Sequence, residues 1–138
     1  MESTASSNIL VVEDNANDSF MLLRELERAQ LEDHVRVIEN GKAALDYLLK
    51  AASVPLVLFL DLRLPGLAGV EVLREIKKVD RLRSMPVIIM TGSSDPQDLK
   101  DCNLLGVTAF LEKPLSLTTF IKTVAHLFPN VNAASRVP

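Results

Sequence analysis

The stretch Leu56-Val57-Leu58-Phe59-Leu60-Asp61 is the most informative for the fold, because five consecutive apolar residues run directly into a carboxylate. An apolar run of this length is typical of a parallel strand that is covered on both faces of its sheet. Neighbouring parallel strands need long crossover connections, which are usually helices. The run therefore predicts a central strand at 56–60, in a sheet whose other strands alternate with helices along the chain.

Two strand and helix units precede this central strand. The β-branched run at 9–12 stops at the polar residues 13–15, and a helical repeat of apolar residues follows. The run at 35–38 ends at the turn signal Asn40-Gly41, and a second helical repeat follows it. The apolar residues of the two repeats are Leu22, Leu26 and Ala29, and then Ala44, Leu45, Leu48 and Leu49.

Two strands and three helices are expected after the central strand. A loop at 64–69 contains one Pro and two Gly, and a strand at 87–90 ends at Thr91-Gly92. The fourth helix should begin near Pro96 and end before Gly106, and a short fifth strand is expected at 109–111. The apolar stripes of the three helices are Val72, Leu73, Ile76 and Val79, then Leu99, Cys102 and Leu105, and finally Leu117, Phe120, Ile121, Val124 and Leu127.

Alternating strands and helices predict the α/β class, with a doubly wound five-stranded parallel sheet and helices on both faces. Such a sheet binds its ligands at the carboxyl ends of its strands, near the point where strand order reverses. Polar or ionisable residues follow four of the five strands, and we expect them to converge there. They are Glu13, Asp14, Asp61, Thr91 and Lys113.

Length and composition restrict the class of protein further. A chain of 138 residues with 48% hydrophobic and 24% charged residues predicts one globular domain. A net charge of -3 without a basic cluster argues against nucleic-acid binding. No apolar run approaches the ~20 residues of a membrane span, and the start of the chain lacks a signal peptide, so a cytoplasmic location is expected. The residues Cys102, His34 and His126 show no metal-ligand spacing.

Three carboxylates at one sheet edge repel one another, and a hard divalent cation relieves that repulsion. Mg²⁺ is expected, with Asp14 and Asp61 as direct ligands and Glu13 acting through water. The other oxygen of Asp61 is then a nucleophile toward phosphorus, with Lys113 balancing charge and Thr91 donating a hydrogen bond. Taken singly, Asp14 is equally well a helix cap and Lys113 a solvated cation, so the prediction rests on the set.

The motifs around these residues resemble those of the response-regulator receiver domain of two-component systems, a flavodoxin-like (β/α)5 fold with strand order 2-1-3-4-5. The resemblance implies a disordered segment at 1–8, a receiver domain at 9–128 and a tail at 129–138. Because about ten residues follow Phe128, a stand-alone regulator that signals through a partner is expected. The matching motifs are Ile9-Leu10-Val11-Val12-Glu13-Asp14-Asn15, Leu60-Asp61-Leu62 with Leu64-Pro65-Gly66 and Gly69, Met90-Thr91-Gly92, and Lys113-Pro114.

By this resemblance, Asp61 accepts a phosphoryl group from a histidine kinase. The family likeness also assigns Mg²⁺ to Glu13, Asp14, Asp61 and the backbone carbonyl of Arg63. It implies that Thr91 and Lys113 contact the phosphoryl group, and that Thr91 and Phe110 form the conformational switch. Such a protein is no enzyme in the usual sense, since it promotes only its own phosphorylation and dephosphorylation.

Two residues depart from the family pattern. Phe110 lacks the hydroxyl of the tyrosine found in many members, so it cannot make a phenolic hydrogen bond when it turns inward. Arg63 stands where a smaller or uncharged residue is commoner, at a position that influences hydrolysis of the acyl phosphate. Contact with the phosphoryl group, obstruction of water and a solvent-facing side chain are all open for Arg63.

Further details resemble the small regulators that accompany bacterial phytochrome histidine kinases. The kinase would then sense light, and the regulator would dimerise through the fourth helix, fifth strand and fifth helix. Phe120 and Phe128 are candidates for that surface, although packing on the sheet is favoured for Phe120. The details are Glu13-Asp14-Asn15 with Asp18, Gly69-Val70-Glu71-Val72-Leu73 with Ile76-Lys77, and Leu82-Arg83 before Met85-Pro86-Val87.

Three other classes of protein fit this sequence less well than the receiver domain does. A flavodoxin-like flavin carrier would need amides or hydroxyls after the first strand, where Glu13-Asp14 repels a phosphate, and only 4% of residues are aromatic. A haloacid-dehalogenase-type phosphatase would place an acid two residues after its nucleophile, where this chain has Arg63. A pseudo-receiver that keeps the fold without the chemistry is disfavoured by the intact set of site residues.

Overall fold

The computed structural model describes residues 9–28, 30, 35–92, 96–113 and 115–124. Five parallel strands form one sheet in the order β2-β1-β3-β4-β5, which confirms the predicted topology. The elements are β1 (Ile9–Val12), α1 (Ala16–Arg28), β2 (Val35–Ile38), α2 (Gly41–Lys50), β3 (Val57–Asp61), α3 (Gly69–Lys77), α4 (Asp80–Arg83), β4 (Val87–Thr91), α5 (Pro96–Leu105), β5 (Ala109–Glu112) and α6 (Leu117–Val124).

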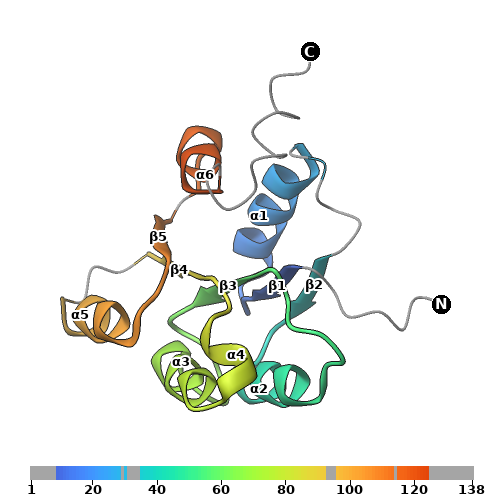
Figure 1. The fold of residues 1–138 in the computed structure, drawn as a ribbon. Coiled ribbons are helices and arrows are strands. Elements are labelled where there is room, and N and C mark those ends of the chain that lie inside the picture. The colour runs from blue at the N-terminus through green and yellow to red at the C-terminus, as the bar shows by residue number, and fades with distance from the viewer. Residues whose placement is uncertain (1–8, 29, 31–34, 93–95, 114, 125–138) are drawn as a thin grey trace.

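Helices cover both faces of the sheet, as Figure 1 shows. The helices α1 and α6 lie on one face, and α2, α3 and α4 lie on the other, with α5 beside α3. Successive residues of a strand point to opposite faces, so each central strand supplies both layers. Leu58 and Leu60 pack toward α2 and α3, whereas Val57 and Phe59 pack toward α1 and α6.

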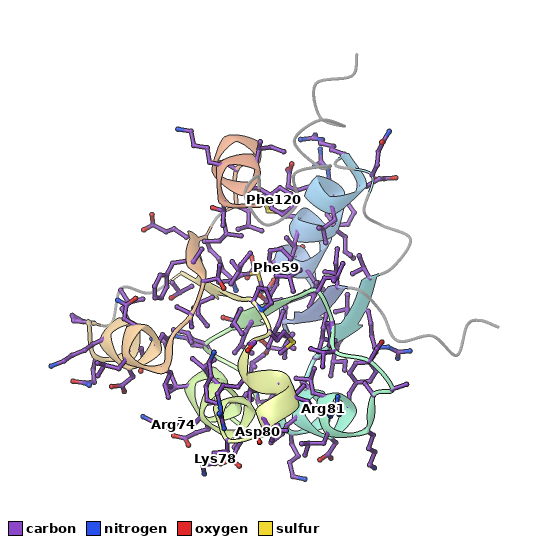
Figure 2. All side chains as sticks on the ribbon, in the orientation of Figure 1. Phe59, Arg74, Lys78, Asp80, Arg81 and Phe120 are labelled. Atoms are coloured by element: carbon purple, nitrogen blue, oxygen red, sulfur yellow. The ribbon has the colours of Figure 1, made fainter. Side chains whose placement is uncertain are left out.

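Phe120 belongs to the layer beneath α6 and is fully buried. Its ring stacks on that of Phe59, with centroids 6.1 Å apart and an angle of 19° between the ring planes (Figure 2). This confirms the packing role that was favoured for Phe120 from its place in the apolar stripe. Phe128, the other aromatic residue considered there, lies outside the described residues.

The structure corrects the expected bounds of two elements. The central strand begins at Val57 rather than at Leu56, whose side chain is exposed, and it includes Asp61 as its last residue. The third helix ends at Lys77, because Val79 is extended and caps a separate short helix, α4. Helix α4 was not expected, and it forms because Leu82 inserts into the core while its N–H donates to the carbonyl of Val79.

Leu49 was also expected in the inward stripe of the second helix, but its side chain is exposed. Ala44 and Leu48 form the buried face there, since they lie four residues apart and therefore one above the other.

The turn Asn40-Gly41 holds the loop that follows β3. The N–H of Gly41 donates to the carbonyl of Pro65 over 3.1 Å. A Cβ atom on Gly41 would lie only 1.9 Å from the carbonyl oxygen of Leu67, so the two loops meet here closely enough to require glycine. The loop at 62–68 therefore runs from Asp61 along a path that the neighbouring turn defines.

Candidate functional site

The five residues that were expected to converge at the strand ends meet at the carboxyl edge of the sheet. Glu13 and Asp14 follow β1, Asp61 ends β3, Thr91 ends β4 and Lys113 follows β5. They surround one open cleft of about 510 Å³. The residues that line it are Glu13, Asp14, Asn15, Asp18, Asp61, Arg63, Thr91, Gly92 and Lys113.

Three carboxylates form the acidic part of the cleft. One oxygen each from Glu13, Asp14 and Asp61 lies within 4.8 Å of the other two. Glu13 and Asp61 are buried, at 1% and 5% exposure, while Asp14 is exposed to solvent. Oxygen ligands at this spacing, one of them open to water, suit a hard divalent cation that keeps several of its own waters.

The charges of the cleft also favour a cation. Four carboxylates line it, including Asp18, and they face only the two cationic side chains Arg63 and Lys113. Like charges this close are stable together only if some carboxylates stay protonated or a further positive charge is bound. The residues present therefore fit Mg²⁺, with Glu13, Asp14 and Asp61 as the side chains around it.

Lys113 is the cation at the centre of this cluster. Its Nζ lies 2.7 Å from Oε1 of Glu13, 2.8 Å from Oδ2 of Asp18 and 3.4 Å from Oδ2 of Asp61. Burial alone would lower the pKa of the Lys113 ammonium, but hydrogen bonds to Asp18 and Glu13 and the charge of Asp61 outweigh it and raise the pKa to about 12. Lys113 is therefore charged throughout the neutral range.

Glu13 is buried between two donors. One carboxylate oxygen pairs with Lys113, and the other accepts a hydrogen bond from the N–H of Asn15 over 3.1 Å. Burial raises the pKa of Glu13 to about 7, and the nearby Asp61 carboxylate adds to this, while the hydrogen bonds from Lys113 and Asn15 act in the opposite direction. Oε1 of Glu13 is therefore buried beside the charge of Lys113 but has no well-aligned hydrogen-bond partner among the described residues.

Thr91 and Lys113 are tied together through the backbone. The N–H of Lys113 donates to the carbonyl of Thr91 over 2.9 Å, so the ends of β4 and β5 are held in register. Phe110 of β5 is half-buried and packs against the core cluster beneath α2 and α3. Phe110 therefore lies outside the cleft, three residues before Lys113.

Arg63 stands at the exposed rim of the cleft. Its N–H donates to Oδ1 of Asp61 over 3.3 Å, so the backbone turns around the carboxylate directly after β3. The side chain of Arg63 is exposed and lines the cleft, which places a second cation within reach of an incoming anion.

Asp18 is the ionisable residue lining the cleft that was not predicted as a site residue. The side chain of Asn15 accepts a hydrogen bond from the N–H of Asp18 over 3.0 Å and so caps the first turn of α1. This turn brings Asp18, four residues after Asp14, to the same edge of the sheet. The sequence signal available for Asp18 was its place in the first turn of a helix that starts at that edge.

This chain is similar in sequence to known response regulators. Residues 9–125 match the family model described as the response regulator receiver domain. The probable methanogenesis regulatory protein FilR2 of Methanothrix harundinacea is 39% identical over 123 residues, covering 86% of this chain and 79% of that protein. The response regulator Rcp1 of Synechocystis is 31% identical over 128 residues, covering 89% of this chain and 87% of Rcp1.

Solved structures show the same fold. The bacteriophytochrome response regulator RtBRR superposes with a TM-score of 0.79 at 34% identity, covering 95% of this chain and 89% of that one. The phosphorylated cyanobacterial phytochrome response regulator RcpA gives 0.76 at 29% identity, with 90% and 92% covered. The Mn²⁺-bound form of Rcp1 gives 0.74 at 30% identity, with 87% and 90% covered.

Proposed function

Because the chain belongs to the response regulator receiver domain family, whose members are two-component signalling proteins and not classical enzymes, we propose that Asp61 accepts a phosphoryl group from a sensor histidine kinase. The observation that carries the proposal is the convergence of the buried Asp61 with two further carboxylates and the Lys113 ammonium in one open cleft. A carboxylate nucleophile needs this combination of access from solvent and nearby positive charge.

The reaction forms a bond between an Asp61 carboxylate oxygen and phosphorus. The bond from phosphorus to the kinase imidazole breaks, and its electron pair leaves with the imidazole nitrogen. Lys113 offsets the negative charge of the phosphoryl oxygens, and the Thr91 hydroxyl donates a hydrogen bond to one of them. Bound Mg²⁺ would supply the remaining positive charge.

Four groups are proposed to hold that ion. Asp14 and Asp61 would be direct ligands, together with the backbone carbonyl of Arg63, and Glu13 would act through water because its carboxylate already pairs with Lys113 and accepts from the N–H of Asn15. The Mn²⁺-bound form of Rcp1 supports a divalent cation, and phosphorylated RcpA supports the phosphoacceptor role. The same groups would promote hydrolysis of the acyl phosphate, so that the protein resets itself.

Output is proposed to pass through the face formed by α5, β5 and α6. When Thr91 turns toward the phosphoryl group, it leaves space into which the half-buried Phe110 moves. The backbone hydrogen bond from Lys113 to Thr91 links the cleft to β5, which supports this route. The face is also proposed as the surface through which two copies dimerise.

A phytochrome is proposed as the partner kinase. Two of the structures most similar to this chain are named as phytochrome response regulators, RtBRR and RcpA. A light-dependent transfer of phosphate from a bacterial phytochrome kinase to this chain, compared with transfer in the dark, tests the partner separately from the chemistry.

The phosphoacceptor role is tested by intact mass after incubation with acetyl phosphate and Mg²⁺. The wild type should gain one phosphoryl group, Asp61→Asn should gain none, and chelation of the metal should abolish the gain. Asp46→Asn is the matched control, because Asp46 is an exposed aspartate on α2 that lies outside the cleft. It should react as the wild type does.

Failure of every variant to gain mass, with acetyl phosphate and with kinases alike, would contradict the proposal. The chain would then be a pseudo-receiver that binds partners without the chemistry. Gain of mass by Asp61→Asn at the wild-type rate would move the phosphoacceptor to another residue.

A further inference from the structure

The contact between Asp18 and Lys113 joins residues 95 positions apart in the chain. Oδ2 of Asp18 lies 2.8 Å from Nζ of Lys113, and the two side chains are 28% and 14% exposed. The side chain of Asn15 caps the first turn of α1 by accepting the N–H of Asp18, so the helix places the Asp18 carboxylate at the cleft. None of the roles proposed above uses this carboxylate.

The three distances around Lys113 show where its ammonium rests. Nζ is closer to Glu13 and Asp18, at 2.7 Å and 2.8 Å, than to Asp61 at 3.4 Å. An ammonium has three N–H donors, one of which already serves Asp18, and the ion pair with Glu13 also draws Nζ away from the phosphoacceptor. Any closer approach of Nζ to a phosphoryl group on Asp61 therefore lengthens one of its present contacts.

Of those two contacts, the one to Asp18 is the easier to release. Glu13 is buried at 1% exposure, so separating it from Lys113 would leave a buried charge without a partner. Asp18 is partly exposed, and water can take the place of the ammonium on its carboxylate. Separating Lys113 from Asp18 therefore costs less free energy than separating it from Glu13.

We propose that Asp18 is a positioning residue that holds the Lys113 ammonium back from Asp61 in the unphosphorylated protein and releases it when the phosphoryl group arrives. The inference rests on the proposed phosphoacceptor role and adds a residue that sets its rate. Asp18 acts only through Lys113 and touches none of the reacting atoms.

The rate of phosphorylation tests this role. With acetyl phosphate and Mg²⁺, an Asp61 oxygen bonds to phosphorus as acetate leaves with the electron pair of the broken P–O bond. Asp18→Asn keeps the size of the side chain and removes its charge, so Lys113 reaches the transferring group sooner. We expect phosphorylation about twofold to fivefold faster, the range that corresponds to a partly exposed ion pair.

Two controls separate this role from a general change of charge. Glu27→Gln removes one negative charge from the exposed side of the same helix and should leave the rate unchanged. In a Lys113→Ala background, where phosphorylation is slower but measurable over longer times, Asp18→Asn should have no effect, because the residue through which it acts is gone.

A metal-free readout accompanies the rates. In nitrogen-15 spectra of the protein without Mg²⁺ or phosphodonor, the Lys113 ammonium protons should exchange with water faster in Asp18→Asn than in the wild type. Glu27→Gln should not change this exchange. The measurement reports the contact itself and does not depend on the reaction.

An unchanged or slower rate of phosphorylation in Asp18→Asn would overturn the inference. An equal acceleration by Asp18→Asn in the Lys113→Ala background would also overturn it, because the effect would then be one of charge through space. A wild type that takes no phosphoryl group overturns the proposed function instead. The exchange of the ammonium protons then still decides whether Asp18 holds Lys113.

Discussion

Lys113 shows how a single residue depends on several distant parts of the fold. Its backbone is set by β4, while its ammonium contacts carboxylates that come after β1, from α1 and from β3. Hydrogen bonds to two of these acids keep its pKa near 12 despite burial. Four elements therefore position the lysine that balances the buried carboxylates of the cleft.

The buried thiol of Cys102 should make the stability of the protein depend on pH. It is fully buried on α5, and burial, followed by the charges of Asp98 and Asp101, raises the pKa of its thiol from 9.0 to about 11. The folded protein keeps the proton where the unfolded chain loses it, so the contribution of Cys102 to stability is constant below pH 9 and is lost between pH 9 and 11. The loss should reach up to about 3 kcal/mol.

Urea unfolding at a series of pH values measures this loss. The decline in stability from pH 9 to 10.5 is assigned to Cys102, because the contribution of Lys113, whose pKa is also raised, is lost only above 10.5 and the lowered pKa of Lys77 acts in the opposite direction. Cys102→Ala should remove the decline within that window. A wild-type curve that stays flat from pH 9 to 10.5 would contradict the assignment.

At the scale of elements, the short helix α4 joins two neighbouring segments. Nη2 of Arg81 donates to the carbonyls of Leu48 and Leu49 over 2.7 Å and 3.0 Å, and so satisfies the last turn of α2 (Figure 2). Lys77 and Arg83 exchange hydrogen bonds between side chain and backbone, which ties the end of α3 to α4. Helix α4 thus serves as a brace between α2 and α3.

Removal of that brace should cost stability. Arg81→Ala leaves two carbonyls of α2 without their donor and should lower the free energy of unfolding by about 1 kcal/mol. Lys78→Ala is the matched control, since Lys78 is a neighbouring exposed cation that pairs only with Glu75 among the contacts described. Chemical denaturation should show a change within about 0.5 kcal/mol for this control. Equal losses in the two variants would argue against a capping role for Arg81.

At the scale of the whole molecule, the parallel sheet accounts for the site. All strands run in one direction, so the residues that follow them gather at one edge even though Glu13 and Lys113 are far apart in sequence. Among the residues that the structure describes, those lining the cleft all come from this edge. Among the helices described, none has the length and apolar character that a bilayer crossing requires.

The proposed dimer is a prediction for the whole molecule. Leu104 on α5 is 77% exposed, so a second copy that covers the face of α5, β5 and α6 would bury it. Leu104→Asp should shift sedimentation equilibrium toward the monomer while leaving phosphorylation intact. Leu56→Asp changes a leucine that is 56% exposed and lies before β3, outside that face, and it should keep the wild-type association. Equal association of all three proteins would exclude this face as the interface.

Local sequence patterns were enough to predict the order of strands and helices along the chain and the polar residues that end the strands. These features follow from local patterns of apolar residues, because a strand or a helix repeats its buried side every two or every three to four residues. The Asn40-Gly41 turn and the start of α5 at Pro96 were readable for the same reason. The shared direction of the strands also predicted which residues line the cleft, namely Glu13, Asp14, Asp61, Thr91 and Lys113.

The pairing of these polar groups depends on how the elements are packed in three dimensions. Asp18 meets Lys113 across 95 positions, and Arg81 meets Leu48 across 33, so neither contact leaves a periodic trace in the sequence. Helix α4 was not predicted because one turn is too short to show a helical repeat. Leu82 is its only buried residue, so no second apolar position marks the helix. Such contacts depend on how packed elements are placed relative to one another, and local hydrophobic patterns do not encode that placement.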